Sequence, residues 1–158
     1  MDKTNKLLNI MLKEKIVSRN AIVENERSTA IRDLITENRF ELVDKKFKGP
    51  YELVFSIDDL GQKINADVKN EQGDKIYKFI ISLKPFRRLI KDYTYICENY
   101  YNVMRTLPAS KIETIDMARR GIHNEGADLL QKVVESNVKI DYETSRRLFT
   151  LITVMHIK

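Results

Sequence analysis

Arginines occur as adjacent pairs in the second half of this chain, and paired arginines suit the binding of anions. The pairs are Arg87-Arg88, Arg119-Arg120 and Arg146-Arg147. A guanidinium group presents a planar fork of donors that contacts phosphate or carboxylate through two hydrogen bonds at once, which lysine cannot do. Ordinary ion pairs within helices are the alternative, since Asp92 follows Arg88 by four residues.

The segment DMARRGIHNEGADLL, residues 116–130, contains one arginine pair and a histidine between two glycines. On a continuous helix Asp116, Arg120 and His123 share one face, and the first two are spaced for an ion pair. Glycine costs about 1 kcal/mol in a helix interior relative to alanine. Gly121 and Gly126 therefore indicate a helix break, a ligand close to the backbone, or close packing against a neighbouring helix, and close packing is the simplest explanation.

Two functional hypotheses follow from these residues. The first is a binding domain for an anionic ligand: a phosphorylated metabolite, a nucleotide or an acidic protein segment. Its predicted binding residues are Arg87, Arg88, Arg119, Arg120, His123, Asn124 and Arg147. The second is an enzyme that uses His123 as general acid or base, with Asp116 or Glu125 orienting the imidazole.

Tyrosines near residue 95 support a third hypothesis. Tyr93 and Tyr100 match the apolar stripe of the expected helix, which leaves Tyr95 and Tyr101 exposed. Exposed tyrosines beside arginines are typical of protein interfaces, so a protein–protein interaction module without a ligand site is an alternative. The same groups can stack on single-stranded RNA, which is the weakest of the options.

Several catalytic classes are excluded by residue types. The five glycines are scattered, so no glycine-rich phosphate loop is present, and the chain contains neither G-x-S-x-G nor H-E-x-x-H. The single cysteine, Cys97, excludes an internal disulfide and any multi-cysteine zinc site, and its place on an apolar stripe predicts a core residue. No metal and no cofactor are expected.

The middle of the chain predicts an antiparallel three-stranded meander. Residues 51–57, 63–69 and 77–83 alternate apolar and polar side chains with the period of two expected for half-buried strands. Gly61 and Gly73 lie in the turn-forming connections between them. Residues 8–12 predict a further strand near the N-terminus.

Helices are predicted on both sides of this meander. Residues 21–38 predict a helix with Ile22, Ile31, Leu34 and Ile35 on its inner face. After the meander, apolar residues from 86 to 104 recur at three- and four-residue steps. Ser110 and Glu113 form a capping-box pattern for the next helix, and Asp141 is the predicted cap of the last. An antiparallel sheet packed against an N-terminal helix and three C-terminal helices is an α+β fold.

Composition sets the broad class. The chain has 158 residues, 42% hydrophobic and 32% charged, with a net charge of +5, which predicts one domain over residues 1–158 and a preference for acidic partners. We expect a cytoplasmic protein, because neither a membrane span nor a secretory signal is recognised in the sequence. The oligomeric state is not predicted.

Four segments resemble a known family over nearly the whole chain. They are ERSTAIRDLITEN (26–38), LKPFRRLIKDY (83–93), DMARRGIHNEGADLL (116–130) and RRLFTLITVMHIK (146–158). They are similar to uncharacterised protein family 0262 of alphaproteobacteria. The resemblance implies a bacterial cytosolic protein built as one domain, and it assigns no activity, cofactor or catalytic residue.

Overall fold

A mixed four-stranded sheet packs against helices in the computed structural model, which describes residues 4–13, 21–106 and 108–156, without the side chains of residues 100–106. The sheet order is β1 (Leu7–Lys13), β3 (Tyr51–Ile57), β4 (Lys63–Lys69) and β5 (Lys75–Ser82). Strands β3, β4 and β5 form the predicted antiparallel meander. The predicted α+β fold is confirmed.

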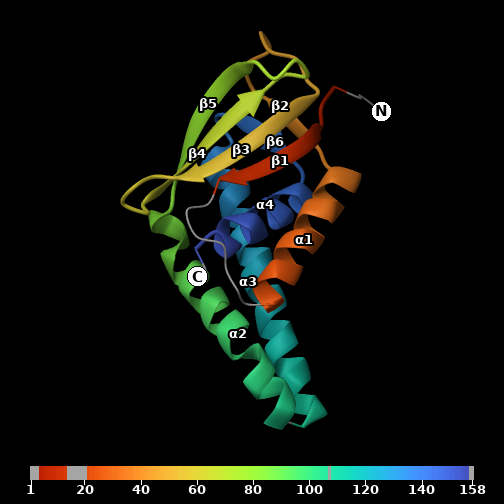
Figure 1. The fold of residues 1–158 in the computed structure, drawn as a ribbon, viewed down its shortest axis with the longest axis vertical. Helices are drawn as coiled ribbons and strands as arrows, with labels where there is room; N and C mark the ends of the chain where they lie inside the picture. Colours follow the sequence, from red (N-terminus) through yellow and green to blue (C-terminus); the bar gives the residue numbers. More distant parts are fainter. Residues whose placement is uncertain (1–3, 14–20, 107, 157–158) are drawn as a thin grey trace.

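Strand β1 pairs in parallel with β3, which makes the sheet mixed. The connection between these two strands contains α1 (Ala21–Thr36), and a parallel pair requires such a crossover rather than a tight turn. Figure 1 shows β1 at the edge of the sheet, beside α1. The parallel direction could not be predicted from the apolar pattern of residues 8–12 alone.

The side-chain amide of Asn38 occupies the outer edge of β1. Its Oδ1 accepts a hydrogen bond from the Leu7 amide at 2.7 Å, and its Nδ2 donates to the Leu7 carbonyl at 2.9 Å. The same nitrogen donates to the Leu34 carbonyl near the end of α1. Asn38 therefore joins the first strand to the helix that follows it.

A second, two-stranded sheet was missed by the sequence analysis. It pairs β2 (Phe40–Leu42) with β6 (Val138–Ile140) in antiparallel register. Each strand has three residues, too few for an alternating pattern to be recognised.

Three helices follow the meander. A 3-10 turn, η1 (Lys84–Phe86), leads into α2 (Arg87–Thr106), then come α3 (Ala109–Val134) and α4 (Tyr142–Val154). Helices α2 and α3 run side by side and extend away from the sheet at the bottom of Figure 1, whereas α4 lies below β1 in that view and packs against α1 and α3. The described core contains apolar side chains from the sheet and from all four α-helices.

Two local predictions about helices were wrong. Ser110 does not cap α3, because Pro108 is the N-cap residue and the helix has already begun at Ala109. Ile35 is 42% exposed, since the buried seam of α1 consists of Val23, Ala30 and Leu34. The prediction for Asp141 is confirmed, because its carboxylate accepts a hydrogen bond from the Thr144 amide at 3.1 Å.

Helix α3 passes through both glycines without a break, and the two have different surroundings. A Cβ atom at Gly126 would lie 2.5 Å from three ring carbons of Phe149. Phe149 is fully buried on α4, so Gly126 is a close helix contact, as the simplest explanation predicted. At Gly121 nothing lies within 4 Å of the same position.

We predict that Gly126→Ala lowers the free energy of unfolding by about 1–3 kcal/mol, because the new methyl group must displace a buried ring. Gly121→Ala is the matched control and should raise it by about 0.5–1 kcal/mol through helix propensity alone. Urea denaturation of both variants measures the difference. Equal stability of the two variants would show that the contact with Phe149 does not constrain α3.

Candidate functional site

The predicted binding arginines do not gather at one place. Arg88 contacts Glu125 of α3 and lies 3.6 Å from Asp92, which confirms the predicted pair within α2. Arg119 contacts Glu26 of α1. Arg146 donates to Glu143 at 2.9 Å on its own helix. Carboxylates of the same molecule therefore occupy arginines from all three pairs.

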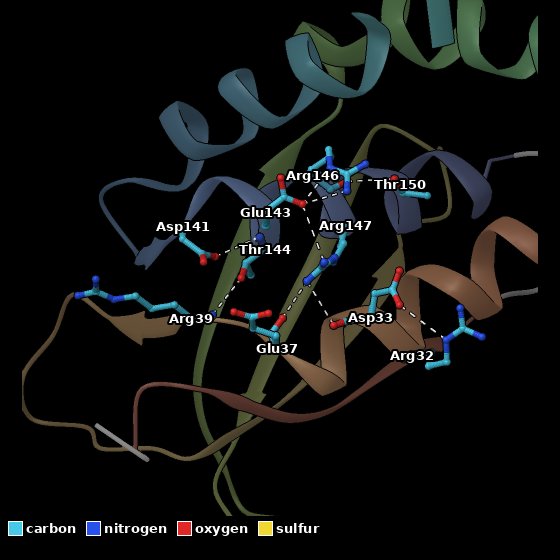
Figure 2. A network of polar contacts seen from close by, with 10 residues as sticks. All are labelled: Arg32, Asp33, Glu37, Arg39, Asp141, Glu143, Thr144, Arg146, Arg147 and Thr150. Atoms are coloured by element: carbon cyan, nitrogen blue, oxygen red, sulfur yellow. Dashed lines mark hydrogen bonds and ion pairs between the residues drawn. The ribbon is translucent and has the colours of Figure 1, made fainter. Parts of the chain in front are cut away.

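Arg147 caps the C-terminal end of α1. Its Nη1 donates to the carbonyl oxygens of Asp33, at 3.3 Å, and Glu37, at 2.9 Å. Figure 2 shows this guanidinium reaching from α4 to the end of α1, with Glu143 on its other side. The last carbonyls of a helix lack partners within it and carry partial negative charge, so a cation stabilises them. This placement gives Arg147 a structural role.

Two of the predicted arginines, Arg87 and Arg120, have no carboxylate partner within the described ranges. Both side chains are exposed. Arg120 lies on the outer surface of α3, and the predicted ion pair between Asp116 and Arg120 does not form. Arg87 lies at the start of α2 and lines a pocket with Lys91, one turn further along.

The pocket at Arg87 has a volume of about 330 Å³, and we call it the basic pocket. It lies between the turn joining β3 to β4, the start of α2 and the end of the chain. Its described lining residues are Leu60, Gly61, Gln62, Leu83, Arg87, Ile90, Lys91 and His156. None of these is acidic.

Backbone contacts hold the turn beside the basic pocket. Asp58 Oδ1 accepts hydrogen bonds from the amides of Gln62, at 2.7 Å, and Lys63, at 3.1 Å. Gly61 has a φ of 68°, which favours glycine. The Gln62 carbonyl accepts from the Leu83 amide at 2.9 Å, which ties the turn to the end of β5. The Asp58 carboxylate thus faces the backbone of its own turn.

His156 contributes an imidazole to the basic pocket. Its Nδ1 lies 2.7 Å from the Ile152 carbonyl, so this nitrogen carries the proton and donates. Burial lowers the pKa of His156, which makes the ring neutral at pH 7. Its Nε2 is then an acceptor, and it has no hydrogen-bond partner in the described structure. Sequence reasoning missed His156 and Lys91, although Lys91 follows Arg87 by four residues and could have been noticed.

His123 lies inside the protein. The residue is 8% exposed, and its ring packs against Tyr93 in a tilted arrangement, at 5.0 Å between ring centroids, and meets Phe149 edge-on at 6.5 Å. Burial lowers its pKa to about 4, and the charges of Arg119 and Arg146 act in the same direction. A general base must reach a bound substrate, and an imidazole enclosed by two aromatic rings does not support that hypothesis.

The other predicted partners of His123 have different contacts. Asn124 accepts a hydrogen bond from the Tyr142 hydroxyl at 2.7 Å, and Glu125 is held by Arg88. Asp116 is partly buried, and its Oδ1 has no hydrogen-bond partner among the residues described. The residues of segment 116–130 that were proposed as one site therefore contact different neighbours and do not form a common site.

A second pocket, of about 370 Å³, lies between α1, α2 and α3, and we call it the interhelix pocket. Its described lining consists of Ala21, Ile22, Asn25, Glu26, Ile96, Cys97 and Arg119. The ion pair between Glu26 and Arg119 lies in this pocket. Cys97 is buried, and burial raises the pKa of its thiol to about 11, which confirms a core cysteine.

The described residues also bear on metal ligands, membrane spans and exposed tyrosines. Across the described ranges, no cluster of three or more His, Cys, Asp or Glu side chains could hold a metal ion. None of the described helices is long and apolar enough to cross a membrane. Tyr95 is 69% exposed as predicted, whereas the side chains of Tyr100 and Tyr101 lie outside the described part.

Comparison with known proteins supports the resemblance noted above. The model of the "Uncharacterised protein family (UPF0262)" matches residues 4–158. The chain belongs to the UPF0262 family. Among similar proteins, a UPF0262 protein of Bradyrhizobium sp. (strain BTAi1 / ATCC BAA-1182) is 44% identical over 158 residues, 99% of this chain and 93% of the relative.

Further UPF0262 relatives come from other alphaproteobacteria. One from Ruegeria sp. (strain TM1040) is 51% identical over 138 residues, 85% of this chain and 86% of that protein. One from Brucella canis is 43% identical over 151 residues, which are 96% of this chain and 93% of that protein. No solved structure matches this UPF0262 chain.

We predict that His123 makes stability depend on pH between about 6.5 and about 4. The pKa of His123 is lower in the folded protein than in the unfolded chain. The stabilisation of the fold by the neutral ring is therefore present above pH 6.5 and is lost as the pH falls through about 4. A shift from 6.5 to about 4 corresponds to about 3 kcal/mol. His123→Leu, of similar volume, should remove this dependence. Urea denaturation at several pH values compares the variant with the native protein, and parallel pH curves would contradict the prediction.

We also predict that Arg147→Met lowers the free energy of unfolding by about 1.5–3 kcal/mol, because two carbonyls lose a charged donor. Arg146→Met is the control. It removes a neighbouring arginine whose ion pair lies within one helix, and should cost less than about 0.5 kcal/mol. Hydrogen exchange at the end of α1 should accelerate in the Arg147 variant alone. Equal effects of the two substitutions would exclude the capping role.

Proposed function

We propose that this protein binds a small anionic ligand in the basic pocket, with Arg87 and Lys91 supplying the positive charge. One observation carries the proposal: two cations face a pocket whose described lining contains no acidic side chain. Four of the six paired arginines, Arg88, Arg119, Arg146 and Arg147, in contrast contact carboxylates or carbonyls of the same molecule. Unpaired cations in a pocket raise the local concentration of anions and lower the cost of binding them.

The walls of the basic pocket favour an anion that also has a less polar part. Leu60, Leu83 and Ile90 contribute apolar surface beside the two cations. A volume of about 330 Å³ is at the small end of ligand pockets. These properties fit a phosphorylated metabolite or a mononucleotide better than an extended acidic peptide.

The polar groups of the pocket suit a phosphoryl group next to a hydroxyl. The Arg87 guanidinium can contact two phosphoryl oxygens, and Lys91 supplies a second positive charge. His156 contributes a neutral ring to the wall, with its Nε2 buried beneath the surface. The Gln62 side chain can donate or accept.

Isothermal titration at low salt with inorganic phosphate, AMP and a hexose phosphate tests the proposal. We expect saturable binding of at least one organic phosphate, more tightly than inorganic phosphate. The double variant Arg87→Gln/Lys91→Gln should raise the Kd by about 10-fold or more. A tenfold change in Kd corresponds to about 1.4 kcal/mol of binding free energy, which the loss of two charged contacts readily exceeds.

The control is Arg120→Gln, which removes an unpaired, exposed arginine outside the basic pocket. It should leave the affinity unchanged, whereas an effect equal to that of the double variant would indicate diffuse charge attraction instead of a site. Absence of binding to all three probes at millimolar concentration would overturn the proposal.

A further inference from the structure

The interhelix pocket contains an ion pair that is largely removed from solvent. The Glu26 side chain is 16% exposed and the Arg119 side chain is 31% exposed. The two residues are 93 positions apart in the sequence, and their contact joins α1 to α3. Removing two charges from water costs several kcal/mol per ion before their attraction is counted. An apolar contact between α1 and α3 would have stabilised the fold at least as well.

Buried polar groups without partners lie directly behind this ion pair. Tyr93 is fully buried, and its hydroxyl makes no hydrogen bond of normal geometry among the described residues, although Glu26 and Cys97 lie close enough to interact with it. Its electrostatic neighbours Glu26, Cys97 and Arg119 all line the pocket, so the hydroxyl is buried just beneath the pocket lining. The His123 ring packs against the same ring at a tilt, and its Nε2 also has no partner within the described chain.

An unsatisfied buried hydroxyl is costly, and phenylalanine would avoid that cost at residue 93. Native proteins contain few such groups, and those present often belong to functional sites. Here two of them are electrostatic neighbours of Arg119, which lines the pocket together with the Glu26 carboxylate. This combination points to a ligand that satisfies polar groups on binding.

The charges in the interhelix pocket restrict the class of ligand. Glu26 repels an anion and Arg119 repels a cation, so a ligand with a single charge meets one unfavourable contact. A zwitterion presents both signs and replaces the partner of each ion. The other described lining residues are the polar Asn25 and four less polar ones, Ala21, Ile22, Ile96 and Cys97, which leave room for an uncharged side chain.

We propose that the interhelix pocket binds a free α-amino acid with an apolar side chain, with Arg119 contacting the carboxylate and Glu26 the ammonium group. The Tyr93 hydroxyl then donates to Glu26 in place of the guanidinium, and the side chain of the ligand packs against Ile22 and Ile96. This site is separate from the basic pocket and does not depend on it.

Isothermal titration with L-leucine and two analogues tests the proposal. One analogue, 4-methylpentanoate, lacks the ammonium group, and the other, 3-methylbutylamine, lacks the carboxylate. We expect leucine to bind with a Kd of about 1 mM or lower and each analogue at least about 10-fold more weakly. Equal binding of either analogue overturns the assignment, and so does the absence of saturable binding across a panel of apolar amino acids at about 10 mM.

Neutral variants identify the residues. Glu26→Gln/Arg119→Gln keeps the shapes of both side chains and should abolish leucine binding. The control, Arg88→Gln/Glu125→Gln, neutralises another ion pair between helices that lies outside the pocket, and should leave the affinity unchanged. Unchanged leucine binding in the Glu26/Arg119 variant contradicts the proposal.

Tyr93→Phe separates a binding role from a structural one. Because it removes an unpartnered buried hydroxyl, it should keep or raise the melting temperature while weakening leucine binding about threefold to tenfold. A lower melting temperature with unchanged affinity would show that the hydroxyl serves the fold, and would overturn its place in the site.

Discussion

The absence of a side chain at Gly126 is the constraint on which the helical layer depends. It allows α3 to approach α4 until the Phe149 ring lies against the backbone of α3. Helix α4 is buried along almost its whole length from Thr144 to Met155, so its position determines where α1, α3 and the sheet can pack. A helix with so little exposed surface tolerates few changes in the volume of its neighbours.

Polar side chains on α4 are satisfied within the core. The Ser145 hydroxyl donates to the Ala127 carbonyl at 2.6 Å, one residue after the close contact at Gly126. The Thr144 hydroxyl accepts from the Arg39 amide at 2.9 Å, and Thr153 donates to the Thr150 carbonyl. Each of these hydroxyls has a hydrogen-bond partner, unlike the Tyr93 hydroxyl and the His123 Nε2 on the α2 and α3 side of the core.

Local patterns predicted the elements well and their long-range contacts poorly. The alternation in residues 51–57 and 63–69 predicted the strands, because one face of this sheet is buried and the other is not. Neighbouring residues on a helix project about 100° apart, so the two arginines of a pair cannot point the same way. This geometry explains why Arg88 is paired while Arg87 faces the basic pocket. The partner of Arg119 lies on another helix, and no sequence spacing indicates it.

The Asn38 amide has a consequence for association between molecules. An outer strand normally offers free N–H and C=O groups on which a strand from another chain can assemble. At Leu7 both groups are already bonded to one side chain that is anchored to the end of α1. A strand of another molecule therefore cannot pair with β1 at Leu7. Strand β1 can form the edge of the sheet without a proline or a charged side chain at this residue.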